Sequence, residues 1–117
     1  RYLQLCDRRQ RQMCIRDSSY AYCSDTCYLP DLYERVKDVT VLYHESTYTS
    51  ENEDRAKIYY HSTARQAALV AQKAGAGRLL LGHYSARYNN ENVLLEEAKA
   101  VFPESYLAQE GMVFEVK

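Results

Sequence analysis

The sequence lacks any long apolar run, and no stretch approaches the roughly 20 residues that a membrane-spanning helix needs. It also lacks the succession of basic, apolar and small residues that marks a secretory signal peptide. These two absences predict a cytoplasmic protein with no membrane partner. The chain begins at Arg1 without an initiator methionine, so we expect it to be cut or incomplete at this end.

A strongly basic balance is missing as well. The net charge of the whole chain is −1, and residues 1–18 hold five arginines against two aspartates, which leaves −4 for the other 99 residues. A protein that binds RNA through bulk neutralisation of phosphates needs a basic working face. We therefore expect any RNA contact made by the body of this chain to be local or mediated by a metal.

Four cysteines are present, but no secretory feature accompanies them. Disulfides are typical of secreted chains, so we expect free thiols. Cys23 and Cys27 have C-x-x-x-C spacing without a second such pair, which makes a zinc or redox site the weaker alternative.

Residues 1–18, "RYLQLCDRRQRQMCIRDS", show neither helical nor strand periodicity, and their composition differs sharply from that of residues 19–117. They resemble a translated sequencing adapter. We predict a non-native or disordered extension here, and the alternative is a basic arm that contacts RNA phosphates.

From Ser19 onward, short β-rich runs alternate with helical patterns, which indicates an α/β layer architecture in a single domain. Thr63 and Gln66 have capping-box spacing, a helix end is expected at Gly75 or Gly77, and Pro103 ends the last helix. Strands are predicted at 19–24, 39–44 and 78–85 with a closing hairpin of 105–109 and 112–116, and helices at 29–38, 62–77 and 90–102.

Polar side chains stand where the predicted strands end. Asp25 follows the first strand, His44 and Glu45 follow the second, His61 precedes a helix, and His83 ends the third strand. Strand ends and the adjoining helix starts form the crevice in which α/β proteins bind ligands. Taken singly, each histidine is more often a structural residue than a ligand. As a set at strand ends, the four are equally compatible with a site at this edge and with structural roles.

Four motifs carry a specific resemblance: "YCSDT", "LYHEST", "HSTARQAA" and "LLLGHYSARY". In order and interval they resemble the C-terminal part of tRNase Z (ribonuclease Z), the metallo-β-lactamase-fold endoribonuclease that trims tRNA precursors at the 3′ end. The resemblance covers residues 19–117. It implies that they form the C-terminal half of an αββα sandwich, with a sheet face exposed where the other half packs.

The resemblance also implies roles for individual residues. Asp25 matches the aspartate that bridges two zinc ions, and His83 matches the last zinc-binding histidine. His61 matches a histidine held to assist the departing 3′ oxygen, as proton donor or by stabilising charge. The alternatives are a turn-capping role for Asp25 and an ordinary helix-start position for His61.

Three further residues would act beside the metals. Arg87 matches the arginine after the metal-binding histidine, and it would either clamp a phosphate or pair with a carboxylate. His44 and Glu45 match a loop tied to substrate placement and would support the site from behind. We hypothesise that Glu45 orients His61 through a hydrogen bond.

The family's H-x-H-x-D-H motif, a further metal-binding histidine and the arm that grips tRNA are missing from this chain. We therefore expect the chain alone to bind zinc weakly and to cleave nothing, whereas the complete protein would be a homodimer that uses two zinc ions on precursor tRNA. The alternatives are another metallo-β-lactamase-superfamily phosphodiesterase or esterase, and a non-catalytic α/β binding module.

Overall fold

The computed structural model describes residues 7–15, 18–109 and 111–113. Its elements, in chain order, are β1 (Asp7–Ile15), β2 (Ser18–Thr26), α1 (Leu32–Arg35), β3 (Val41–Glu45), the 3-10 turn η1 (Ser50–Asn52), α2 (Glu53–Ile58), α3 (Ala64–Ala74), β4 (Arg78–Gly82), α4 (Asn92–Lys99) and β5 (Ser105–Leu107).

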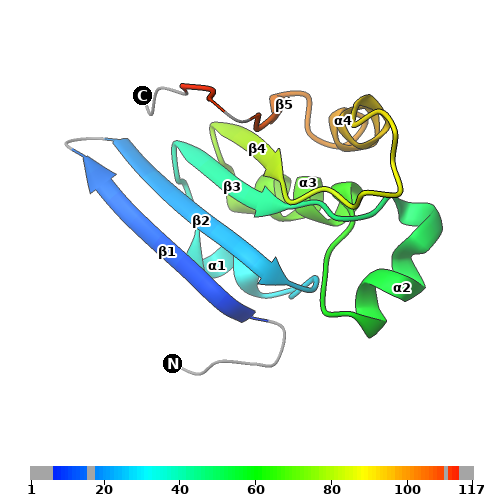
Figure 1. Ribbon diagram of the computed structural model, residues 1–117. Helices are drawn as coiled ribbons and strands as arrows, with labels where there is room; N and C mark the ends of the chain where they lie inside the picture. The colour runs from blue at the N-terminus through cyan, green and yellow to red at the C-terminus, as the bar shows by residue number, and fades with distance from the viewer. Residues whose placement is uncertain (1–6, 16–17, 110, 114–117) are drawn as a thin grey trace.

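The five strands form one sheet in the order β1-β2-β3-β4-β5. Strands β2 to β5 run parallel, and β1 pairs antiparallel with β2 at the edge. Since parallel strands end at the same edge, the carboxyl ends of β2, β3 and β4 meet, and their arrowheads point toward α2 (Figure 1). The predicted α/β architecture is confirmed, and the polar strand ends lie at one edge.

One face of the sheet carries the hydrophobic core. Side chains of α1, α3 and α4 pack there against Ala21, Leu42, Leu79 and Leu81 of the strands. The buried face of α3 consists largely of alanines, so this helix approaches the sheet closely. Burial of each leucine contributes about 1.5–3 kcal/mol.

The ends of α3 follow the sequence signals. Thr63 Oγ1 accepts from Gln66 N at 3.1 Å, and Gln66 Oε1 accepts from Thr63 N at 2.9 Å, so the predicted capping box is confirmed. The helix ends at Gly75, whose φ of 71° is a left-handed conformation that glycine adopts without strain.

The opposite face of the sheet is rich in tyrosine. The rings of Tyr22 and Tyr43 stack with centroids 4.6 Å apart. A Cβ at Gly82 would overlap the Tyr43 hydroxyl oxygen, so only glycine lets this ring lie over the end of β4.

Several predicted elements differ from the structure. Residues 7–15 form β1 although their sequence shows no strand period, because backbone pairing with β2 supplies the hydrogen bonds. Whether residues 1–18 are native stays a prediction, and residues 1–6 and 16–17 lie outside the described part. Helix α2 occupies a polar stretch where no helix is predicted, and the helix expected at 29–38 is reduced to α1.

The predicted closing hairpin is wrong within the described residues. Strand β5 pairs in parallel with β4, through Leu79 N donating to Glu104 O and Ala108 N donating to Leu81 O, both at 2.8 Å. Met112 and Val113 form no strand, and residues 110 and 114–117 are not described.

The cysteine prediction is confirmed for Cys23, which is a buried thiol outside any disulfide. It is wrong for Cys27, which is disulfide-bonded. Among the described residues, no helix is long and apolar enough to cross a bilayer.

Candidate functional site

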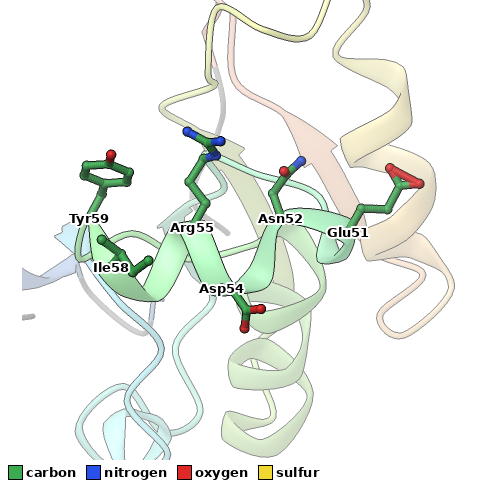
Figure 2. A pocket seen from close by; sticks show the side chains of 6 residues that line it. All are labelled: Glu51, Asn52, Asp54, Arg55, Ile58 and Tyr59. Carbon is green, nitrogen blue, oxygen red and sulfur yellow. The ribbon is translucent and has the colours of Figure 1, made fainter.

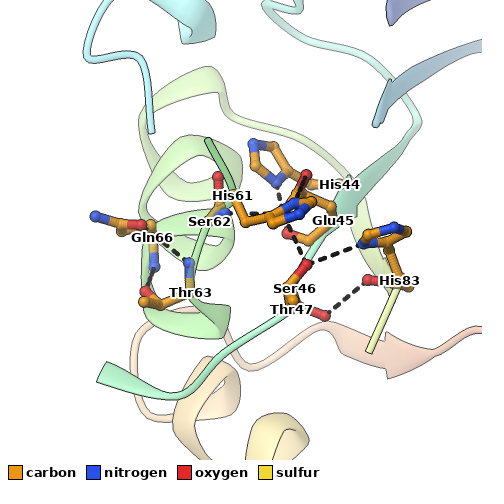
Figure 3. A network of polar contacts seen from close by, with 10 residues as sticks. His44, Glu45, Ser46, Thr47, His61, Ser62, Thr63, Gln66 and His83 are labelled. Atoms are coloured by element: carbon orange, nitrogen blue, oxygen red, sulfur yellow. Dashed lines mark hydrogen bonds and ion pairs between the residues drawn. The ribbon is translucent and has the colours of Figure 1, made fainter. Parts of the chain in front are cut away.

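Three of the predicted residues come together at the carboxyl edge of the sheet. Glu45 ends β3, His83 directly follows β4, and His61 lies in the loop before α3; each offers a ligand atom, and these atoms all lie within 4.8 Å of one another (Figure 3). Glu45 stands opposite Gly82 in the parallel register, which places His83 beside it. The sheet therefore assembles this cluster from residues 38 positions apart in the chain at most.

Glu45 is the centre of the cluster, and its side chain is fully buried. The carboxylate accepts hydrogen bonds from Ser62 N at 2.8 Å, Thr47 Oγ1 at 2.9 Å and His61 Nδ1 at 3.0 Å. A buried carboxylate is costly unless such donors surround it. The hydrogen bond between Glu45 and His61 that we hypothesise from the sequence is present in the structure.

The hydroxyl of Thr47 orients the ring of His83. This hydroxyl donates its single proton to Glu45 and lies 2.9 Å from His83 Nδ1. It must therefore accept from His83, so Nδ1 carries a proton, and in the neutral imidazole the lone pair is then on Nε2. An imidazole in this state can bind a metal ion through Nε2.

His61 is held in the same way. Its Nδ1 contacts the carboxylate of Glu45, and its side chain stays 23% exposed. Its ring centroid is 5.1 Å from that of His83, with the two planes tilted by 32°. Two imidazoles thus lie side by side, each anchored through Nδ1, and the Nε2 of such a ring is the atom that could bind a metal ion or transfer a proton.

The backbone at this edge adopts strained conformations. His83 has a φ of 61° and Tyr60, next to His61, has a φ of 62°. Left-handed conformations are uncommon for such residues and concentrate at functional sites. Ser46 stabilises the turn at His83, because its N and Oγ both donate to the carbonyl oxygen of Gly82, at 2.7 and 3.1 Å.

His44 does not join the cluster, because neighbouring residues of a strand point to opposite faces. It is fully buried, and its Nδ1 donates to the backbone oxygen of Glu45 at 2.8 Å. Burial lowers the pKa of His44, which keeps the imidazole neutral. Its Nε2 has no hydrogen-bond partner among the described residues. The side chain therefore supports Glu45 only through the backbone.

Two predicted residues remain, Asp25 and Arg87. Asp25 is next to last in β2, and its side chain is outside the part that the structure describes, so its role stays a prediction. Arg87 is exposed, and its guanidinium has no hydrogen-bond or ion-pair partner within the described part of the chain. The alternative in which Arg87 pairs with a carboxylate has no support among these residues.

Sequence reasoning missed two hydroxyls. Thr47 joins Glu45 to a histidine 36 residues later, and Tyr88 OH accepts from Thr49 N at 2.8 Å and from Asn52 Nδ2 at 2.9 Å. Both residues stand inside the quoted motifs or at their end, but nothing local in the sequence identifies their partners.

Comparison with known proteins agrees with the motifs. Ribonuclease Z of Bacteroides thetaiotaomicron is 50% identical over 93 residues, which are 80% of this chain and 29% of that protein. Ribonuclease Z of Cytophaga hutchinsonii is 46% identical over 109 residues, 91% of this chain and 35% of that protein. The chain thus spans about a third of the length of these curated relatives. No protein-family model matches the chain.

Solved structures show the same relationship. The metallo-β-lactamase fold protein YhfI from Bacillus subtilis matches with a TM-score of 0.78 and 26% identity, over 85% of this chain and 40% of that one. The short form of human tRNase Z matches with a TM-score of 0.64 and 27% identity, over 86% of this chain and 34% of that one. The chain therefore has the metallo-β-lactamase fold over the part that it spans, and it is a homologue of one part of ribonuclease Z.

Proposed function

We propose that the complete protein containing this chain is a zinc-dependent endoribonuclease that removes 3′ trailers from tRNA precursors. One observation carries the proposal: His61 and His83 are both oriented through Nδ1 around the buried carboxylate of Glu45. This arrangement occurs in a chain that is 50% identical to a segment of a ribonuclease Z.

The residues present fit a divalent metal. The lone pair on His83 Nε2, fixed by the hydrogen bond to Thr47, suits zinc, and Asp25 would add carboxylate oxygens able to bridge two ions. When bound, such a metal pair supplies hydroxide near neutral pH and stabilises charge on the phosphate. With only Asp25 and His83 as ligands, we propose that the chain alone binds zinc weakly and is inactive.

His61 is the proposed proton donor to the departing 3′ oxygen. The Glu45 carboxylate holds its Nδ1 and stabilises the positive charge of the protonated ring, so the proton on Nε2 points away from the buried acid. Arg87, which is exposed, is proposed to clamp the phosphate. We further propose that the complete protein is a cytoplasmic homodimer.

A second candidate is another phosphodiesterase or esterase of the metallo-β-lactamase superfamily. The observation in its favour is the TM-score of 0.78 with YhfI, which exceeds the 0.64 with human tRNase Z. The curated relatives at 50% identity favour the RNA substrate.

The test compares two substrates with a full-length protein that carries this segment. We expect cleavage of a precursor tRNA at its 3′ end, loss of cleavage with a chelator, and a fall in kcat of about 10²- to 10⁴-fold for His61→Ala. Lys73→Ala, an exposed change at the far end of α3, is the control and should leave kcat unchanged. Hydrolysis of bis(p-nitrophenyl) phosphate without any cleavage of precursor tRNA would support the second candidate instead.

A further inference from the structure

A cavity beside His61 has no part in the chemistry proposed above. It has a volume of ≈ 470 Å³ and is lined by Tyr28, Glu53, Asp54, Lys57, Tyr60 and His61, among others. This volume lies within the range of small-molecule pockets, about 300–1,000 Å³. We propose that the cavity binds one unpaired nucleobase of the RNA, a proposal that rests on the proposed endoribonuclease function.

The aromatic side chains give the first reason. Tyr28 is partly buried and packs against the core, so its ring is fixed, whereas Tyr60 is 41% exposed. Proteins recognise unpaired bases by stacking them on aromatic rings of this kind. A hydrogen bond from His61 N to Ala56 O, at 2.8 Å, stabilises the left-handed turn at Tyr60. This turn fixes the backbone position from which the Tyr60 side chain extends.

The charges of the cavity favour a base over a phosphate. Two carboxylates, Glu53 and Asp54, face one ammonium group, that of Lys57. Carboxylates repel phosphate but accept hydrogen bonds from the amino groups of bases. Lys57 offers donors for a base carbonyl or ring nitrogen.

The position of the cavity indicates which nucleotide of the RNA would supply the bound base. His61 lines the cavity and also belongs to the cluster with Glu45 and His83. A base bound here therefore belongs to a nucleotide on one side of the cleaved bond. Its binding would fix the register of the RNA chain against the proton donor.

The neighbouring Tyr59 provides a matched control. It lines a second hollow on α2, together with Arg55 and Ile58, which has only Asp54 in common with the cavity, and it is 57% exposed (Figure 2). Two adjacent tyrosines thus serve different hollows, and only that of Tyr60 adjoins His61.

The experiment is a double-mutant cycle between Tyr60 and the base, with a full-length enzyme carrying this segment. Tyr60→Asn removes the ring, and asparagine tolerates a positive φ. On precursor tRNA we expect kcat/KM to fall roughly 5- to 150-fold, from the usual worth of one stacked base. Tyr60→Phe and Tyr59→Asn should stay close to wild type.

The second arm of the cycle uses precursors with an abasic nucleotide on either side of the cleaved bond. At one of the two positions, we expect loss of the base to slow the wild-type enzyme and to add little to the defect of Tyr60→Asn. Full additivity at both positions would overturn the proposal. So would a loss for Lys57→Ala that salt abolishes and that is independent of the base, because the cavity would then bind phosphate.

Two readouts separate failure of this proposal from other failures. A wild-type enzyme that leaves precursor tRNA intact overturns the proposed function, whereas cleavage without coupling overturns only the base site. Hydrolysis of bis(p-nitrophenyl) phosphate, a substrate without a nucleobase, shows whether Tyr60→Asn has disturbed the turn before His61. If it falls, Glu53→Gln takes the place of Tyr60→Asn in the same cycle, since Glu53 lines the cavity from α2.

Discussion

Two carboxylates join the segment after β3 to the start of α3, and their surroundings differ. Glu45 accepts from Thr47 Oγ1 at 2.9 Å and from Ser62 N at 2.8 Å. Glu97, on α4, accepts from Ser50 Oγ at 2.9 Å and from Arg65 N at 3.0 Å. Each carboxylate therefore accepts a hydrogen bond from a hydroxyl of the segment after β3 and another from a backbone N–H group at the start of α3.

Their burial is what separates them. Glu45 is 0% exposed, whereas Glu97 is partly exposed and its hydrogen bonds lie at the surface. Water can replace a lost donor at Glu97, but no water competes at a fully buried carboxylate. The same bonding pattern thus gives a rigid anchor for His61 at one place and a helix cap at the other.

Glu45→Gln should have the largest effect that distinguishes the two clusters. The amide keeps one oxygen that can accept where Oε2 does, but it carries no negative charge, and its N–H group replaces the Oε1 that lies 3.1 Å from His61 Nδ1, so two donors then face each other at His61. In the full-length enzyme we expect kcat on precursor tRNA to fall by about 10- to 100-fold, the usual cost of losing such a supporting contact. Steady-state kinetics measures this, and Glu96→Gln on the exposed side of α4 is the control.

Because a purely structural role would also lower kcat, the pH profile of this variant is informative. A positioning role predicts a changed profile, since Glu45 contacts the ring of His61. A kcat of Glu45→Gln equal to wild type would show that Glu45 does not orient His61.

Thr47→Val should have the next largest effect, which is a lower affinity for zinc. Valine removes the hydroxyl that accepts from His83 Nδ1 and so releases the imidazole from its fixed tautomer. We expect zinc affinity of the full-length protein to fall about tenfold, at the lower end of such effects. Competition with a chromogenic chelator measures it. Thr47→Ser keeps the hydroxyl and should retain wild-type affinity; equal losses for both variants would contradict the tautomer argument.

The sequence predicts those parts of the fold that local signals determine. Thr63 and Gln66 cap α3 and Gly75 ends it, as their spacing and conformational preferences require. Strands β3 and β4 follow from their apolar runs. Strand β1 and the parallel pairing of β5 depend on partners distant in the chain, so no local pattern reports them.

Some contacts of the site are likewise predictable from the sequence, and others are not. The contact between Glu45 and His61 is anticipated through the family motifs, whereas the bridge from Thr47 to His83 crosses 36 residues and emerges only from the sheet register. The expectation that all three histidines converge overlooks strand alternation. His44 and Glu45 are neighbours in a strand, where successive side chains point to opposite faces of the sheet. One of the two therefore points to the core and the other to the site.

Glu97→Gln should have the smallest effect, and it should lower only the stability of the protein. Its carboxylate accepts from Ser50 N and from Arg65 N, in the first turn of α3, where negative charge favours the helix dipole. We expect the free energy of unfolding to fall by about 0.3–1 kcal/mol, the worth of a charge near a helix end. Urea denaturation measures this, with Glu96→Gln as the control. Because Glu97 is partly exposed, about 1 M salt should shrink the difference, since the Debye length is then about 3 Å. Turnover should stay at the wild-type value; a loss matching that of Glu45→Gln would mean that the geometry of His61 depends on both carboxylates and that burial does not separate them.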